Sequence, residues 1–216
     1  MNKGVVIRFI LCLVIAGFIF SCEEKTVDYG LGTYFVEIVT AQNENEFLSD
    51  NGNRIVAISY DNKKTYASGD RVLLNYTLLS STSSENNYNV RINGSTKIPL
   101  GKLALSNDSS IVSSGKEQIL LESVWLGSHY LNMQFYFNYK SITHKIGLLA
   151  DSLQLEGDTL RMYFTHDSDN DPPGYPNHVY LSFDLNEVLG APGNSRLISV
   201  QINTSNYGDK TYEFKY

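Results

Sequence analysis

The chain has 216 residues, of which 42% are hydrophobic and 19% are charged, and its formal net charge is −6. At about 100–200 residues per domain this length allows one or two domains, and the hydrophobic fraction excludes a disordered chain. The acidic balance excludes a nucleic-acid-binding protein, because affinity for a phosphate backbone depends on clustered Lys and Arg, and two cysteines are too few for a disulfide-rich fold.

Residues 1–21 have the three parts of a secretory signal sequence. Lys3 and Arg8 supply positive charge, residues 5–20 form an otherwise apolar run, and a small residue directly precedes Cys22. A spanning helix needs about 20 apolar residues, so an uncleaved membrane anchor is the less favoured alternative. The end of the run resembles a bacterial lipobox, at which the chain is cut before the cysteine and lipid, palmitate included, is attached. We therefore expect a lipoprotein signal peptide over 1–21 and lipidation of Cys22.

Residues 22–32 are expected to form a flexible tether. Glu23 and Glu24 resemble the surface-export signal of Bacteroidetes lipoproteins, and a solvated spacer is an equally weighted alternative. Two or more acyl chains hold a protein stably on a membrane. We expect a protein anchored to the outer membrane, on either the cell surface or the periplasmic face. Without residues 1–21 the chain keeps 15 basic and 23 acidic residues, a net charge of −8.

Residues 33–107 contain alternating runs rich in β-branched and aromatic residues. The turn signal Asn51-Gly52 separates the first two runs. Five strands in about 70 residues have the size of an OB-like barrel, so we predict this small barrel as the first domain. The expected strands are Thr33–Val39, Arg54–Tyr60, Arg71–Thr77, Tyr88–Ile92 and Thr96–Leu105.

A stretch rich in Ser, Asp and Gly, residues 107–116, is the expected linker. The second predicted domain covers residues 108–216 and includes most of this linker. Its remaining part holds seven short strand candidates with turn signals between them, which favours an antiparallel β-sandwich. One helix-like turn is expected at 184–189. The strands are expected at Ile119–Val124, Tyr130–Tyr139, Lys145–Ala150, Thr159–Thr165, Val179–Asp184, Arg196–Ile202 and Thr211–Tyr216. The predicted fold class is thus all-β, a barrel followed by a sandwich.

Three phrases of the sequence, spread over both predicted domains, resemble the NigD-like lipoproteins of Bacteroidetes. They are Gly69–Thr77 (GDRVLLNYT), Trp125–Asn132 (WLGSHYLN) and Leu181–Leu185 (LSFDL). The resemblance covers the whole mature chain in the same order. It implies an N-terminal OB-like domain and a C-terminal sandwich behind a lipoprotein signal, and a link to bacteriocin immunity. It supplies no catalytic residues.

The sharpest local cluster of carboxylates is Asp167, Asp169 and Asp171, at alternate positions between two strands. Ca²⁺ takes six to eight oxygens, and these three residues fit the first ligand places of an EF-hand loop. Pro172 then occupies the place of the turn glycine, and His178 occupies that of the bidentate glutamate. A solvated acidic loop is therefore favoured over a calcium site, and no metal is predicted.

No other pattern indicates a cofactor or a catalytic site. The four histidines (His129, His144, His166 and His178) show no close pair of the kind that zinc sites use. A serine-nucleophile elbow is also missing, so we expect no enzyme. Trp125, the single tryptophan, is expected to pack in the sandwich core.

Two short patterns and the abundant tyrosine bear on function. Asp151-Ser152-Leu153 and Asp158-Thr159-Leu160 resemble the O-glycosylation acceptor of Bacteroidetes, which makes Ser152 and Thr159 candidate sites. Fifteen tyrosines suit recognition of a protein or a sugar. The favoured function is a non-enzymatic binding protein with a protein or peptide partner, bacteriocin immunity being a special case. The alternative is a carbohydrate-binding accessory lipoprotein, with Tyr175, Tyr180 and Tyr207 as stacking faces.

Overall fold

The computed structural model describes residues 31–82, 86–107, 117–155, 157–190 and 196–216. The expected signal peptide, Cys22 and most of the expected linker lie outside these ranges. Within them, no helix has both the length and the apolar character needed to cross a membrane.

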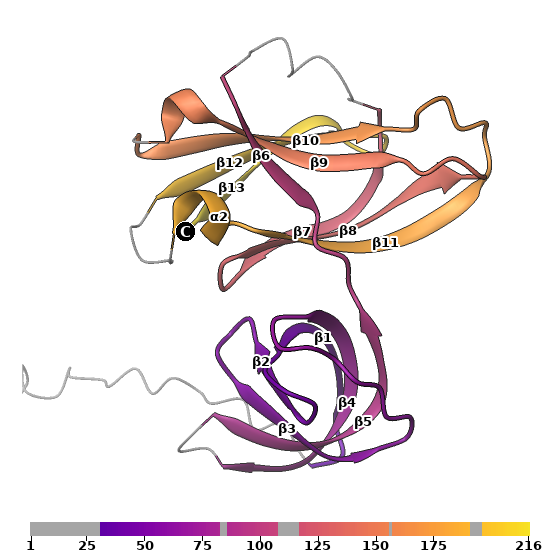
Figure 1. Ribbon diagram of the computed structural model, residues 1–216, viewed down its shortest axis with the longest axis vertical. Coiled ribbons are helices and arrows are strands. Elements are labelled where there is room, and N and C mark those ends of the chain that lie inside the picture. Colours follow the sequence, from indigo (N-terminus) through magenta and orange to yellow (C-terminus); the bar gives the residue numbers. More distant parts are fainter. Residues whose placement is uncertain (1–30, 83–85, 108–116, 156, 191–195) are drawn as a thin grey trace, which may run out of the picture. The chain divides into compact units, whose positions relative to one another are not determined.

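The first five strands close into a barrel in the order β1-β2-β3-β5-β4, as Figure 1 shows. All neighbouring pairs are antiparallel except β3 and β5, which are parallel. The predicted OB-like barrel is confirmed. Its core includes Val39, Phe47, Ile55, Leu74 and Ile92, all of which are buried. The strands are β1 (Tyr34–Ala41), β2 (Glu46–Ser49), β3 (Arg54–Tyr60), β4 (Arg71–Thr82) and β5 (Asn87–Lys97).

The prediction of a fifth barrel strand over Thr96–Leu105 is wrong. Its first residues end β5, and Pro99 and Gly101 interrupt the run, as these residues commonly do. The remainder forms β6 (Lys102–Ser106), which pairs with β9 in the sandwich. The domain boundary expected after residue 107 therefore lies between β5 and β6, and the short strand β2, which was not predicted, completes the barrel.

Two sheets form the sandwich, one of five strands in the order β13-β12-β10-β9-β6 and one of three in the order β11-β8-β7 (Figure 1). A 3-10 turn, η3 (Ser152–Gln154), and a one-turn helix, α2 (Asn186–Leu189), connect strands, the latter within the expected helical stretch. The strands are β7 (Leu120–Gly127), β8 (Tyr130–Tyr139), β9 (Lys145–Asp151), β10 (Thr159–Asp167), β11 (Tyr175–Asp184), β12 (Leu197–Thr204) and β13 (Gly208–Lys215).

The sandwich is mixed rather than purely antiparallel as predicted. β6 is parallel to β9, and β10 is parallel to β12. The chain leaves β10, crosses to the other sheet as β11, and returns through α2 to lie beside β10. Such a crossover permits parallel pairing, whereas a hairpin does not. One apolar cluster between the two sheets forms the core, with Leu131, Phe135, Leu160, Phe183 and Val200 at its centre.

Candidate functional site

Glu122 is the extra residue of a β-bulge in β7. Leu121 and Ser123 pair with successive residues of β8, so Glu122 has no partner in the ladder. Bulges often re-aim a side chain toward a functional surface. In β7 the bulge places the Glu122 carboxylate on the outer, solvent-facing side of the three-stranded sheet, where its side chain is 38% exposed.

The same bulge reverses the alternation of side chains along β7. Ile119 and Leu121 before it belong to the core, whereas Val124 and Leu126 pack against the core after it. Trp125 consequently points to the outer face and is half-buried. The prediction that Trp125 packs in the core is wrong. Strict alternation from Leu121 would place its side chain inside the sandwich, but the extra residue of the bulge turns it to the outer face.

Three polar side chains from β8 and β11 surround the Glu122 carboxylate. His178 Nε2 lies 3.0 Å from Oε2, and the Gln134 side-chain amide donates to the same oxygen. The Tyr136 hydroxyl also hydrogen-bonds to the carboxylate; partial burial, together with the nearby charge of Glu122, raises the pKa of this tyrosine. Glu122, Gln134, Tyr136 and His178, with Tyr180 beside them, are called the Glu122 cluster below.

The aromatic rings of the cluster form a row across β8 and β11. Tyr136 and His178 stack with their ring centroids 4.3 Å apart and their planes 12° from parallel. The Tyr180 ring also contacts His178, with the ring centroids 4.9 Å apart and the planes tilted by 51°. The row is rigid, because these side chains sit at neighbouring positions of a paired ladder.

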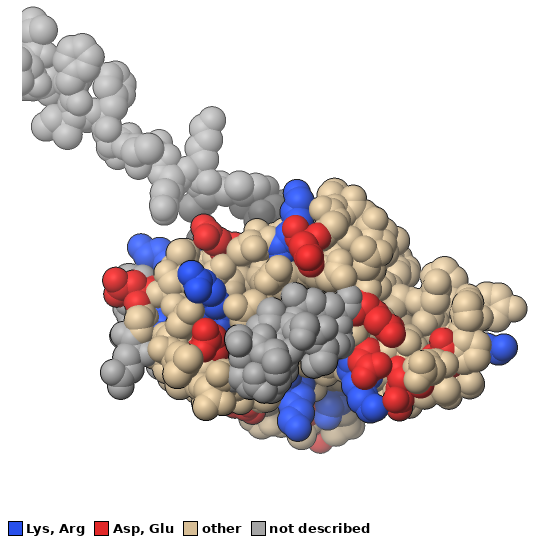
Figure 2. Space-filling model, turned by 90° about the horizontal axis from the view of Figure 1, so that it is seen from above, with Lys and Arg blue, Asp and Glu red and all other residues tan. Residues whose placement is uncertain are grey.

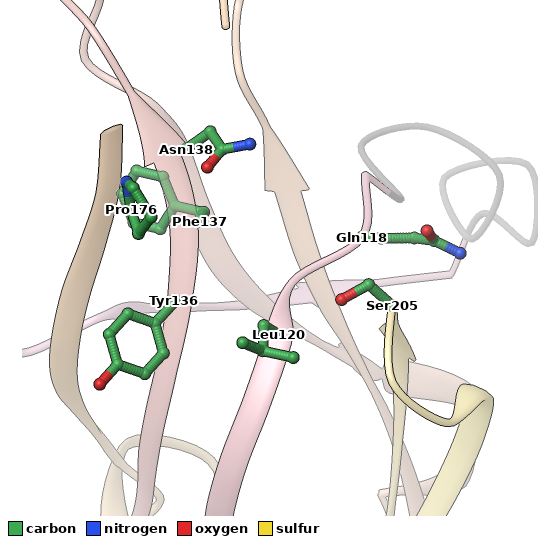
Figure 3. A pocket seen from close by; sticks show the side chains of 7 residues that line it. All are labelled: Gln118, Leu120, Tyr136, Phe137, Asn138, Pro176 and Ser205. Atoms are coloured by element: carbon green, nitrogen blue, oxygen red, sulfur yellow. The ribbon is translucent and has the colours of Figure 1, made fainter. Parts of the chain in front are cut away.

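A pocket of about 450 Å³ opens beside the cluster, and Figure 3 shows the side chains around it. It arises where the pairing of β7 with β8 ends: Leu120 still pairs with Tyr136, whereas Ile119, directly before β7, bridges to Thr204 of the opposite sheet. The volume lies in the range of small-ligand sites. Its lining is Gln118, Leu120, Tyr136, Phe137, Asn138, Pro176 and Ser205.

Behind Phe137 a chain of hydrogen bonds joins three polar side chains. The Phe137 ring contacts the rings of His144 and His166, at centroid distances of 4.5 and 5.2 Å. His144 Nδ1 is 2.8 Å from His166 Nε2, and His144 Nε2 is 3.3 Å from Asp171 Oδ2. The spacing of the two histidines along the chain does not indicate this pairing. It results from the β9–β10 register, which places His166 opposite Ile146.

The surroundings of these hydrogen-bonded side chains set the protonation of Asp171 and His166. Burial alone would raise the pKa of Asp171, but backbone N–H groups of Lys140, Ile142 and Ser141 and the His144 ring together lower it to about 2. Burial, reinforced by the charge of His144, lowers the pKa of His166. The arrangement therefore keeps an ionised carboxylate and a neutral His166 at neutral pH.

The three aspartates of the acidic loop do not converge on one point. Asp167 accepts a hydrogen bond from the backbone of Asp169, Asp169 pairs with Lys145 at 3.0 Å, and Asp171 belongs to the histidine chain. No group of three His, Cys, Asp or Glu in the described ranges could hold a metal ion. The favoured reading, an acidic loop between strands, accounts for the geometry, since each carboxylate has its own partner.

The remaining candidates lie apart from the Glu122 cluster. Ser152 begins η3 and Thr159 begins β10, and both are half-buried. Tyr175 is 85% exposed and Tyr207 is 59% exposed. Tyr207 belongs to the turn between β12 and β13, whereas Tyr175 and Tyr180 are separated by an odd number of strand positions and so face opposite sides of β11. The three tyrosines named as stacking faces do not form one surface.

A buried arginine joins barrel to sandwich. The Arg71 side chain is 0% exposed and makes two hydrogen bonds to Asp50, at 2.7 and 2.8 Å. It also donates to Asn132 of β8, at 3.0 Å, and lies over the Tyr130 ring, 4.0 Å from its centroid. Ser182 of β11 donates in turn to Asn132. These five residues are called the Arg71 junction.

The family model described as the NigD-like C-terminal beta sandwich domain matches residues 102–216, more than half of the chain. The chain belongs to the NigD-like family. The match begins at β6, which agrees with the observed domain boundary. A comparison with curated protein sequences gives no significant match.

Solved structures similar to this NigD-like chain include two from Bacteroides species. A protein of unknown function from Bacteroides vulgatus has 23% identity and a TM-score of 0.72, covering 85% of this chain and 91% of that one. A NigD-like immunity protein from Bacteroides caccae has 19% identity and a TM-score of 0.59, covering 87% and 98%. At these identities the likeness concerns the fold.

The three phrases that resemble the NigD-like family meet at the Arg71 junction. The first contributes Arg71, the second Tyr130 and Asn132, and the third Ser182. Gly127, also in the second phrase, has no room for a Cβ, which would lie 2.6 Å from Cβ of Asp50. The phrases therefore specify how two domains join. The Glu122 cluster lies outside these phrases. Its position depends on the bulge in β7, which the alternation of residues in the sequence does not reveal.

Proposed function

We propose that this NigD-like chain is an outer-membrane-anchored lipoprotein that binds a protein or peptide partner without catalysing a reaction, and that its role is bacteriocin immunity. The observation that carries the binding proposal is the Glu122 cluster, an ordered polar and aromatic surface next to a pocket. Lipid attachment at Cys22 follows from the sequence, and the immunity role from the family and from the name of the Bacteroides caccae neighbour.

The surface supports binding rather than catalysis. Among the described residues, no hydroxyl or thiol nucleophile is hydrogen-bonded to His178, whose partners are Glu122 and Gln134. A nucleophilic mechanism needs such a pair. On the face seen in Figure 2, positive and negative side chains are interspersed without a basic patch.

The proposal is tested in the bacterium that encodes the chain. Deletion of the gene should increase killing by a bacteriocin from a neighbouring strain, and the wild-type gene should restore survival. The variant Cys22→Ala should lose metabolic labelling by palmitate and protect less well, because it has no acyl chains. Unchanged killing of the deletion strain by every bacteriocin tried would overturn the immunity role. A Cys22→Ala protein that still incorporates palmitate, or a wild-type protein that incorporates none, would overturn the anchor.

A carbohydrate-binding role is the second candidate, because Trp125 and Tyr136 give the outer sheet face two half-buried aromatic rings. A glycan array with the unlipidated mature chain tests it. Binding to a glycan that Tyr136→Ala abolishes would favour this role over a peptide partner. O-glycosylation of Ser152 and Thr159 is proposed separately, and a mass of the purified native protein equal to that of the unmodified lipoprotein would contradict it.

A further inference from the structure

Among the described residues, no Lys or Arg faces the Glu122 carboxylate, whose ion-pair partner is the titratable side chain of His178. The carboxylate also contacts Gln134 and Tyr136. By contrast, the barrel carboxylates Glu44 and Glu46 each pair with a Lys or an Arg. None of the donors to Glu122 has a permanent positive charge.

We propose that the Glu122 cluster binds a Lys or Arg side chain of an extended partner peptide, and that an apolar side chain of the same peptide enters the adjacent pocket. This inference rests on the proposed function in that it takes the partner to be a protein or peptide. It goes further by specifying the chemistry of the bound segment and the residues that recognise it.

The carboxylate is prepared for one more donor. An ionised carboxylate offers about four lone-pair sites, and its contacts with His178, Gln134 and Tyr136 occupy at most three of them. The bulge and the hydrogen bonds hold it in one orientation, so that little conformational entropy is lost when a cation binds. An exposed fraction of 38% leaves the group accessible. A charge-assisted hydrogen bond to an ammonium or guanidinium is the strongest bond this position can form.

The ring geometry favours a basic side chain over a sugar. A sugar stacks on a free aromatic face, but the Tyr136 and His178 rings stack on each other, and Tyr180 packs against His178 with its ring plane tilted by 51°. The row therefore uses part of its aromatic surface for its own packing and places hydroxyl groups beside the carboxylate. The net charge of the whole chain, −6, also attracts cationic partners over a longer range.

The pocket sets the spacing of the second contact. Leu120, 45% exposed, lines the pocket two residues before Glu122 on β7. Two residues of a strand span about 7 Å. An extended peptide running along β7 therefore places an apolar side chain against Leu120, Phe137 and Pro176 when its basic residue, two positions away, reaches Glu122.

The test is an NMR titration of residues 22–216, carrying Cys22→Ser, with the peptide acetyl-Leu-Ala-Arg-amide. We expect chemical-shift changes at Glu122, Tyr136 and His178, and affinity at least tenfold weaker when arginine is replaced by the neutral isostere citrulline. Glu122→Gln should weaken binding as much. Glu187→Gln, the same change at an exposed residue of α2, should leave binding unchanged.

Equal affinity for the arginine and citrulline peptides, or for wild type and Glu122→Gln, would overturn the inference. So would the absence of shifts in the cluster, or shifts there with a glycan and none with the peptide. The deletion strain separates the two proposals. If it loses protection while Glu122→Gln protects fully, the binding function stands and the basic-residue site fails. If it loses nothing, the immunity role fails, and the titration still decides the site.

Discussion

At the scale of single residues, Arg71 shows how a costly side chain can specify an arrangement. Burying a guanidinium is unfavourable unless it is paired and hydrogen-bonded, and a buried ion pair adds little net stability compared with apolar packing. Asp50, Asn132 and Tyr130 supply the pairing. Because these partners come from both domains, the junction stabilises one specific arrangement of barrel and sandwich. We take this to be the role of Arg71.

Asp171 should contribute acid-sensitive stability. Its folded-state pKa of about 2 lies below the reference value of 3.8, so its contribution is present above pH 3.8 and is lost as the pH falls toward 2. Asp171→Asn should flatten the dependence of the unfolding free energy on pH between about 4 and 2, as measured by urea denaturation. Asp169→Asn, whose carboxylate is 49% exposed, should keep the wild-type slope. Identical slopes for wild type and Asp171→Asn would contradict the assignment.

Single residues are also where sequence reasoning reached its limit. Cys22 could be named because a lipobox is local. The meeting of His144 with His166 could not, since 22 residues separate them and only the hairpin register brings them together. Glu122 carried no signal of its own, because one exposed carboxylate in a strand is common and its importance depends on a bulge.

At the scale of elements, alternation located most of the strands but not their partners. β8 was expected at its observed bounds, because the alternation of Leu131, Met133 and Phe135 with polar residues is unambiguous. β2 has four residues, too few for a pattern to emerge. β6 was assigned to the barrel, because nothing in a strand's own residues says which sheet it joins, and that choice is decided by pairing across long stretches of chain.

The junction between elements can be tested through glycine. Gly127→Ala would place its Cβ 2.6 Å from Cβ of Asp50, so that Asp50 must move away from Arg71. We expect the free energy of unfolding to fall by about 1–3 kcal/mol, as for other overpacked sites. Gly94→Ala is the matched control: it lies in β5 with open space around it, and alanine there should be neutral or stabilising by up to about 1 kcal/mol. Equal losses in the two variants would contradict the tight packing at the junction.

At the scale of the whole molecule, composition and the signal sequence predicted the class of protein, whereas the recognition surface had to come from the structure. The chain is acidic and all-β, with a barrel followed by a sandwich. The family phrases mark the joint between these two parts, and the outer face of the β11-β8-β7 sheet offers the ordered cluster and the pocket. Our proposal places recognition on this face and lipid anchoring at the N-terminal segment.

The most direct test of this account is survival of the deletion strain under bacteriocin when it carries Tyr136→Ala or Tyr163→Ala. Both tyrosines are half-buried, Tyr136 on the three-stranded sheet and Tyr163 on the five-stranded sheet. Membrane abundance and melting temperature of each variant are measured alongside, so that loss of fold is recognised. We expect Tyr163→Ala to protect like wild type and Tyr136→Ala to lose protection. Full protection by folded Tyr136→Ala, or its loss in Tyr163→Ala alone, would contradict this expectation.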